Sequence, residues 1–289
     1  MVDAGQPAGG AGVATATLDR ERVVPSWRAR LTELIQSRRP NGLLELLLVG
    51  LGYWAYSLIR NGVPTHVDAA MHRARSLYAF ERELGIGFEQ ALNKATDGIN
   101  WLVVSANYFY ATMHFAVTIG VLLWLYVKHP TRYRPLRTVL YLTTILALLG
   151  FWLMPLAPPR LLGEYGFIDT IIKHHTWGSL ASGDVAEFSN QYAAMPSMHA
   201  GWALWCAVAV FFLAERTWVR IAALVYPVLV ALVIVATANH FVLDIIGGAL
   251  TLCAGFGLQY ALFRRRALPD PGDGEGEGEQ SRLGHAVSC

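Results

Sequence analysis

Six long apolar stretches, separated by polar segments, dominate the pattern of hydrophobic and polar positions along the chain. Each runs for about 20 residues with few or no charges, which is the length that a helix needs to cross a membrane. The alternation typical of half-buried strands is absent. Because backbone hydrogen bonds must be satisfied inside lipid, the pattern predicts an all-α integral membrane protein, a bundle of six transmembrane helices. The predicted helices cover residues 43–60, 100–127, 137–157, 195–213, 218–238 and 241–263.

Two of the connections between these stretches are long. Residues 66–98 mix charged residues with apolar residues at helical spacing, which predicts an amphipathic helix or helix pair on the outer membrane surface. We interpret this segment as a cap over the bundle, with a role in substrate access as the alternative. Residues 158–194 form a connection that is rich in aromatic and basic residues, so we expect a functional loop there.

The two ends of the chain have compositions that cannot build a hydrophobic core. Residues 1–40 begin with a run of small residues, and residues 266–289 contain the acidic, glycine-rich tract PDPGDGEGEGEQ. Both ends are predicted to be largely disordered. The remaining residues, 41–265, are predicted to form one catalytic membrane domain.

Composition and charge agree with the membrane class. The chain is 54% hydrophobic and 15% charged, which is too apolar for an ordinary soluble enzyme, and we expect no nucleic-acid partner. Six crossings would place both termini on one side, and that side would carry sixteen of the 23 Lys and Arg residues. By the positive-inside rule, we predict a multi-pass protein of the cell membrane with both termini in the cytoplasm.

A polar motif opens the fourth apolar stretch. The segment AAMPSMHAGWAL, residues 193–204, contains a proline, a serine and a histidine before its apolar run. Pro196 is expected to start the helix, because a missing N–H costs least in the first turn. Ser197 and His199 would then lie in that turn, where free N–H groups and the helix dipole favour an anion.

Two further elements are predicted to reach the same outer face. The segment TANHFVLD returns the chain to the level of His199, and its His240 and Asp244 are four residues apart, on one face of a helix. Arg160 follows the third apolar stretch. Ionisable groups at membrane depth are costly, so this gathering indicates a functional site with an outward-facing orientation.

The chemistry of this set suits phosphoryl transfer without a metal or a cofactor. A histidine paired with a carboxylate can act as a nucleophile. A second histidine can protonate a leaving oxygen, because an ordinary histidine pKa of about 6.5 suits acid and base work near neutral pH. An arginine and a helix N-terminus can hold phosphoryl oxygens, which assigns Arg160 and Ser197 to phosphate binding.

Four other residues are candidates for a substrate pocket. His114 lies in the second stretch with Tyr110 one turn before it, and a buried Tyr–His hydrogen bond is the plainer interpretation. Asn239 is expected to be a turn residue, with a polar contact in the site as the alternative. Lys173 is a candidate headgroup contact in the second connection, where a solvated loop face is the simpler hypothesis.

These motifs resemble the type 2 phosphatidic acid phosphatase superfamily, whose membrane members have six helices. The resemblance covers residues 100–262. The segment PSMH at 196–199 is similar to the Pro-Ser-Gly-His of the family, and HFVLD at 240–244 is similar to its His-x-x-x-Asp. The resemblance implies that His240 is the nucleophile, that Asp244 orients it, and that His199 protonates the leaving group.

The sequence departs from the family pattern in its first and third motifs. The first motif usually reads Lys, six residues, Arg-Pro, but here Leu153 and Leu161 flank Arg160 at the Lys and Pro positions. Val233 and Ile234 stand where the third motif usually has Ser-Arg. These departures, with Met198 in place of glycine, resemble the branch that contains inositol phosphorylceramide synthases, which are inositolphosphotransferases.

The leading hypothesis is therefore a lipid phosphatase or phosphotransferase that works through a phosphohistidine and transfers a phosphorylated headgroup. Its substrate would be a phospholipid or a polyprenyl phosphate. A plain phosphatidic acid or polyprenyl diphosphate phosphatase is the alternative. Two other classes remain open at this stage, a zinc hydrolase with His199, His240 and Asp244 as ligands, and a proton-coupled transporter.

Overall fold

The computed structural model describes residues 40–61, 67–176 and 191–269. Within these ranges the regular secondary structure is helical. The β-type pairing found there is an isolated bridge between Leu156 and Ala193. The predictions of disorder for the two chain ends concern residues that lie mostly outside the described ranges. The all-α prediction is confirmed for the described part of the chain.

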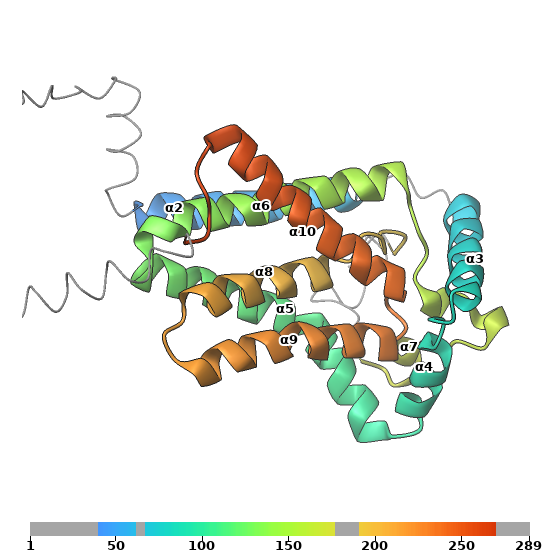
Figure 1. The fold of residues 1–289 in the computed structure, drawn as a ribbon. Coiled ribbons are helices and arrows are strands. Elements are labelled where there is room, and N and C mark those ends of the chain that lie inside the picture. Colours follow the sequence, from blue (N-terminus) through green and yellow to red (C-terminus); the bar gives the residue numbers. More distant parts are fainter. Residues whose placement is uncertain (1–39, 62–66, 177–190, 270–289) are drawn as a thin grey trace, which may run out of the picture. The chain divides into compact units, whose positions relative to one another are not determined.

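Six apolar helices form the bundle (Figure 1). Five of them are long and apolar enough to cross a membrane, which indicates a multi-pass membrane protein. The sixth, α8, has 16 residues and a length of about 24 Å at 1.5 Å per residue, so the predicted count of six spanning helices is not confirmed. The bundle consists of α2 (Gly42–Asn61), α5 (Asn100–Lys128), α6 (Pro130–Leu153), α8 (Met198–Leu213), α9 (Thr217–Ala236) and α10 (Val242–Phe263).

Prolines account for the largest error in the predicted boundaries. The third helix was expected at 137–157 but runs from Pro130 to Leu153. Pro130 fits at the first helical position because its missing N–H needs no partner there, so the helix begins early. Pro155 ends it, because the residue before a proline is pushed out of helical geometry.

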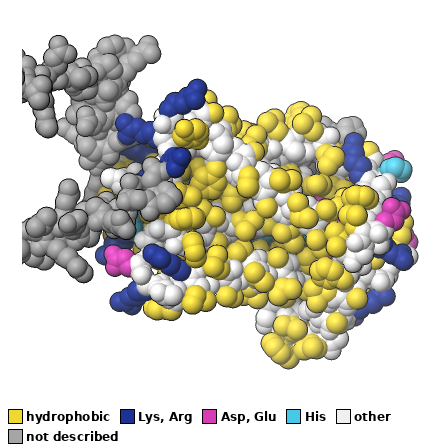
Figure 2. Space-filling model, viewed as in Figure 1, with side chains coloured by type: hydrophobic (Ala, Val, Ile, Leu, Met, Phe, Trp, Pro, Cys, Tyr) yellow, Lys and Arg dark blue, Asp and Glu magenta, His cyan; other side chains and the backbone are white. Residues whose placement is uncertain are grey.

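The surface of the bundle supports its placement in a membrane. Figure 2 shows hydrophobic side chains across the middle of the described part, with charged side chains gathered towards its two ends. Leu46, Leu153 and Leu250 are among the large apolar side chains that are mostly exposed. Exposed apolar area of this extent would be unfavourable in water but is expected against lipid.

The amphipathic segment forms the predicted helix pair, α3 (Val67–Glu83) and α4 (Glu89–Asp97). The apolar face of α3 packs through Ala70, Ala74 and Tyr78 into a small core. That core also contains Phe241, which immediately precedes α10. The cap is therefore attached to the end of the bundle at which α10 begins.

The second long connection is partly helical. It contains two short 3-10 turns, η1 (Pro159–Leu161) and η2 (Gly163–Tyr165), and a single α-turn, α7 (Thr170–Lys173). Its residues 177–190 lie outside the described ranges.

Glycines allow α8 and α10 to approach each other closely. A Cβ at Gly248 in α10 would collide with the carbonyl oxygen of Ser197 and would lie 3.2 Å from the backbone nitrogen of Gly201. A Cβ at Gly201 would in turn lie 3.5 Å from the carbonyl oxygen of Gly248. The backbones themselves are in contact, so the N-terminus of α8 is held against the first two turns of α10.

We expect Gly248→Ala to destabilise the protein by about 1–3 kcal/mol, because the backbone of Ser197 cannot move aside as a flexible side chain would. Gly257→Ala on the same helix is the matched control, since nothing lies within 4 Å of its added Cβ. That control should be neutral or stabilising by up to about 1 kcal/mol, as helix propensity predicts. Thermal unfolding in detergent micelles measures both, and equal midpoints would contradict the close-packing argument.

Candidate active site

The two motif histidines come together between α8 and α10. His199 is the second residue of α8, and His240 lies in the turn between α9 and α10. Their ring centroids are 5.5 Å apart, with the ring planes inclined at 57°. The structure therefore brings the two predicted histidines together.

Asp244 fixes the position of His240. Its Oδ2 lies 3.3 Å from Nδ1 of His240 and accepts a 2.9 Å hydrogen bond from the backbone N–H of Phe241. The Asp244 side chain is fully buried. Its backbone carbonyl accepts the N–H of Ser197 at 3.0 Å, which connects the turn of α10 to the start of α8.

His199 is enclosed by aromatic rings from α5. Tyr110 stacks on it with a centroid distance of 4.3 Å and an interplanar angle of 23°, and His114 packs edge-on at 4.2 Å. Nδ1 of His114 lies 3.0 Å from the backbone carbonyl of Tyr110. Tyr110 and His114, two of the four predicted pocket residues, therefore lie against His199.

The start of α8 differs from the prediction. Pro196 precedes the helix, joined to Met195 by a cis peptide bond, and Ser197 is the N-cap residue. The Ser197 side chain is fully buried, and its Oγ accepts the N–H of Ala200 at 3.3 Å. The helix begins at Met198 because this cap supplies the acceptor that a first-turn N–H needs.

Arg160 is held beside His240 by the α9–α10 turn. Its Nε donates to Oδ1 of Asn239 at 3.1 Å, and its backbone N–H donates to the carbonyl of Ala238 at 2.8 Å. Its guanidinium also lies 3.5 Å from Oδ2 of Asp169 and 3.4 Å from Oε1 of Gln191. Asn239 is thus both a turn residue and a contact of the site.

Asp169 and Gln191 are two contacts of Arg160 that were not predicted from the sequence. Asp169 had a usable signal, because it stands directly before TIIK as the N-cap of α7 and accepts the N–H groups of Ile171 and Ile172. Gln191 had no such sequence signal, because a single glutamine in a long connection belongs to no recognisable motif.

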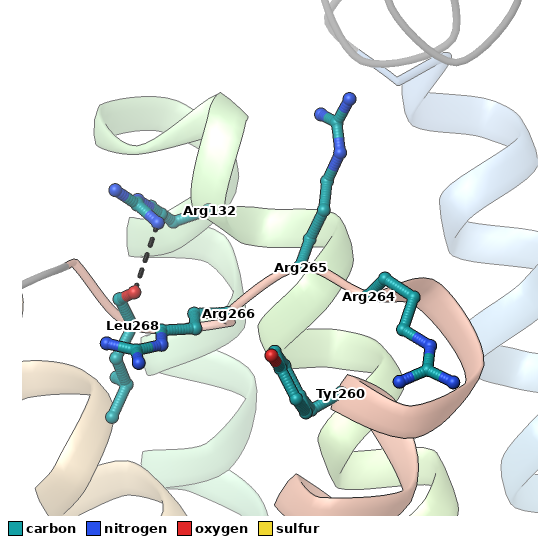
Figure 3. Close-up of a pocket in the computed structure, with 6 residues that line it drawn as sticks. All are labelled: Arg132, Tyr260, Arg264, Arg265, Arg266 and Leu268. Atoms are coloured by element: carbon teal, nitrogen blue, oxygen red, sulfur yellow. Dashed lines mark hydrogen bonds between the residues drawn. The ribbon is translucent and has the colours of Figure 1, made fainter. Parts of the chain in front are cut away.

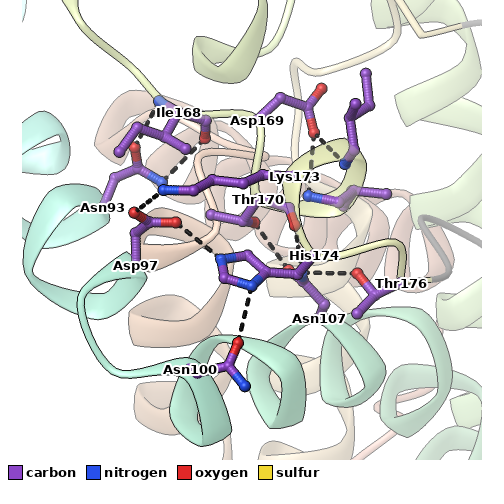
Figure 4. A network of polar contacts seen from close by, with 12 residues as sticks. Asn93, Asp97, Asn100, Asn107, Ile168, Asp169, Thr170, Lys173, His174 and Thr176 are labelled. Carbon is purple, nitrogen blue, oxygen red and sulfur yellow. Dashed lines mark hydrogen bonds and ion pairs between the residues drawn. The ribbon is translucent and has the colours of Figure 1, made fainter.

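Lys173 takes part in a polar network that fastens the second connection to α4 and α5 (Figure 4). Its Nζ donates to Oδ2 of Asp97 at 2.6 Å, and Nε2 of His174 lies 2.9 Å from Oδ1 of the same carboxylate. Asn93 and Asn107 bind the backbone of the connection at Ile168 and Thr170. The ion pair between Lys173 and Asp97 favours an anchoring role for Lys173 over a headgroup contact.

We expect Asp97→Asn to loosen this connection and to lower stability by about 1–3 kcal/mol. Although burial opposes it, the hydrogen bonds from Lys173 and His174 hold the pKa of Asp97 below its usual range. The contribution of Asp97 is therefore present above the ordinary Asp pKa of about 3.9 and is lost as the pH falls through the lower folded value. Amide hydrogen exchange of residues 159–176 measures the effect.

Asp68→Asn, at an exposed position of α3, is the matched control for this charge removal. Exchange in residues 159–176 that is equally slow in both variants would show that Asp97 does not hold the connection.

A polar pocket with a volume of 490 Å³ lies at the end of α10 that is remote from His240 (Figure 3). The helix has 22 residues, so about 33 Å separate this pocket from the turn that carries His240. Arg132 donates to the carbonyl of Leu268 at 3.2 Å beside it. The pocket is separate from the histidine site. Its arginines make that end of the bundle basic. Its lining residues are Arg132, Tyr260, Arg264, Arg265, Arg266 and Leu268.

The zinc alternative requires at least three ligands to converge on one point. Within the described ranges, no group of three His, Cys, Asp or Glu side chains is placed to hold a metal ion.

Comparison with known proteins gave one match. A family model described as the PAP2 superfamily matches residues 75–258, a range that contains the second half of α3, all of α4, Arg160, His199, His240 and Asp244. No curated protein and no solved structure matches the chain.

Proposed function

Because the chain belongs to the PAP2 superfamily, and is therefore a phosphatase-type enzyme that acts on phosphoric esters, we propose that it cleaves a membrane lipid phosphate through a phosphohistidine on His240. The single observation that carries this proposal is the set of His199, His240 and Asp244. The two rings lie 5.5 Å apart, and a buried carboxylate 3.3 Å from Nδ1 fixes the nucleophile.

The geometry supports a definite tautomer for His240. With Nδ1–H donating to Asp244, the lone pair of Nε2 is available for attack on phosphorus. The new P–N bond forms as the P–O bond to the lipid breaks, and His199 gives its proton to the leaving oxygen. Asp244 stabilises the imidazolium character that develops on His240 during this step.

The second half of the reaction regenerates the enzyme. A water molecule, or the hydroxyl group of an acceptor, attacks the phosphohistidine and loses its proton to His199. The P–N bond breaks and His240 returns to its neutral state. Hydrolysis releases phosphate, whereas transfer to a hydroxyl group leaves a new phosphoester.

Arg160 and the start of α8 are the groups that we propose for binding the phosphoryl oxygens. Arg160 is 14% exposed and is oriented by Asn239, the neighbour of His240 in sequence. A guanidinium that is held in place needs little reorganisation as negative charge develops on the equatorial oxygens. Ser197 contributes the N-cap geometry that directs the free N–H groups of α8, and its own hydroxyl hydrogen can still be donated.

Transfer of a headgroup is the finer form of this proposal. Ordinary members carry Ser-Arg where this chain has Val233 and Ile234, and both residues lie in α9, with Ile234 buried. An apolar wall in place of a cation holds a compact phosphate less firmly, which favours an esterified headgroup. We also propose that the site faces the outer side of the cell membrane, because the opposite end of α10 carries Arg264, Arg265 and Arg266.

The test is to incubate the purified protein in detergent with phosphatidic acid, phosphatidylinositol and polyprenyl diphosphate, with and without inositol or another polyol. Release of free phosphate, or of inositol phosphate from phosphatidylinositol, supports hydrolysis, and formation of a new phosphoester on the added polyol supports transfer. Turnover that is abolished by a chelator and restored by zinc would contradict the metal-free mechanism. Failure to convert any phosphoric ester would contradict the proposed function.

A further inference from the structure

Two glutamates of the cap are buried against the start of α10. Glu81 in α3 and Glu89 at the first position of α4 both have a relative exposure of 0%. Oε1 of Glu81 accepts the N–H of Leu243 at 2.6 Å, and Oε1 of Glu89 accepts the N–H of Val242 at 3.3 Å. The cap thus binds the backbone of the helix that carries Asp244.

With Asp244 included, three successive N–H groups at this helix start each meet a carboxylate oxygen. Asp244 accepts from Phe241, Glu89 from Val242 and Glu81 from Leu243. These are the donors that a helix leaves without intrahelical partners, and the positive end of the dipole favours negative charge beside them. Glu81 and Glu89 reach them from segments 153 or more residues earlier in the chain.

The remaining oxygens of the two glutamates are unusual. Oε2 of Glu81 and Oε2 of Glu89 are buried and accept no hydrogen bond from any donor in the described residues. Fully buried carboxylates are rare unless they are paired, and two adjacent carboxylates cannot both ionise cheaply. The two carboxyl groups are within hydrogen-bond reach of each other, so a proton on one of them supplies a donor for the other.

We propose that Glu81 and Glu89 share one proton and act as positioning residues for the catalytic turn 240–244. This inference rests on the proposed function of His240. The pair fixes the N–H groups of Val242 and Leu243, which set the direction in which α10 begins. The direction of α10 in turn sets where Asp244 places the ring of His240.

The surroundings of the pair make the shared proton sensitive to pH. The titratable groups that interact with the pair are Tyr78 on α3 and Asp244 at the start of α10; Arg82 in turn interacts with Tyr78, and His240 with Asp244. Burial, followed by the hydrogen bond to Glu89 and the charges of Glu89 and Asp244, raises the pKa of Glu81 well above its usual range, against the opposing bond from Leu243.

The sign of the pH effect follows from this shift. A group whose folded pKa is raised stabilises the fold fully below its unfolded pKa, about 4.3 for Glu, and loses that contribution as the pH rises through the folded value. Above that value, a second negative charge beside Asp244 repels one glutamate from the helix start. The catalytic turn then loses a support on the alkaline side.

The test uses Glu81→Gln, because an amide reproduces the protonated acid. Its carbonyl can accept the N–H of Leu243, and its NH₂ can donate to Glu89 with no proton to lose. We expect activity within about two-fold of the parent at neutral pH, and a flatter decline of kcat/KM from about pH 7 to about pH 10. Glu81→Ala should lower kcat by about ten-fold or more, because the N–H of Leu243 is left buried and unpaired.

Glu83→Gln is the matched control, since Glu83 is exposed on the same helix. The lipid phosphate and the histidines titrate in the parent and in every variant. Their effects on the pH profile therefore cancel when the profiles are compared. Thermal unfolding over the same pH range gives a second readout that does not depend on turnover. There the midpoint of the parent should fall with rising pH more steeply than that of Glu81→Gln.

Three outcomes would overturn the inference. Glu81→Gln could show the same alkaline decline as the parent, Glu81→Gln could lose as much activity as Glu81→Ala, or Glu81→Ala could retain full activity. None of these would affect the role of His240, which its own variant tests. If the parent cleaves no phosphoric ester, the unfolding curves still decide whether the pair shares a proton.

Discussion

Replacing His240 by alanine should abolish turnover, with kcat at least about 10³-fold below that of the parent. The imidazole supplies the atom to which the phosphoryl group is transferred, and no other side chain of the site can replace it at that position. Asp244 would remain buried with one of its oxygens facing an empty volume. The measurement is phosphate release or phosphodiester formation from the lipid that the parent converts best.

The same variant should lose the covalent intermediate. Brief incubation of the parent with ³²P-labelled substrate, followed by quenching in alkali, should leave label that is stable to base and released by acid, as a P–N bond requires. His240→Ala should show none. His72→Ala is the matched control, because His72 is an exposed histidine of α3, and it should retain both label and turnover. Label of equal intensity on His240→Ala would place the nucleophile elsewhere.

The features that the sequence predicted best are those that depend on neighbouring residues. Five of the predicted spans recur as long apolar helices, because hydropathy adds up along a helix without regard to its partners. His240 and Asp244 were joined by their spacing of four, and His199 was brought to them by counting membrane crossings. Each of these inferences uses only spacing and order along the chain, and none requires knowledge of how the helices pack.

The features that it did not predict depend on contacts between distant segments. The ring of Tyr110 stacks on His199, although its spacing indicated only a relation to His114. Glu81 and Glu89 lie in an amphipathic segment where a charged residue normally marks the solvated face. Their burial is decided by the N–H groups at the start of α10, more than 150 residues away in the chain.

Hydropathy also did not predict the residue at which α8 begins. The predicted span 195–213 begins three residues before α8, because Ser197 caps the helix and Gly248 brings it against α10 at that point. The N-cap residue Ser197 and the close approach of α8 to α10 place His199 at the start of the helix. The point at which α8 begins therefore determines the position of His199, the second histidine of the site.

The second large effect is expected for His199→Asn, and it should depend on the leaving group. A lipid alkoxide leaves only if it receives a proton, so loss of the acid should slow cleavage of the lipid ester by about 10²–10⁴-fold. An aryl phosphate such as p-nitrophenyl phosphate expels p-nitrophenolate, a stable anion that needs no proton to leave. Formation of the phosphohistidine from the aryl substrate should therefore be reduced far less.

The second step separates this role from a structural one. His199 also takes the proton of the attacking water or hydroxyl group, so its loss should slow breakdown of the intermediate for either substrate. With the aryl phosphate, His199→Asn should accumulate more labelled His240 than the parent does. An equal loss of cleavage with both substrates, with no accumulated label, would show that His199 supports the site through its packing on Tyr110 and His114 and does not transfer a proton.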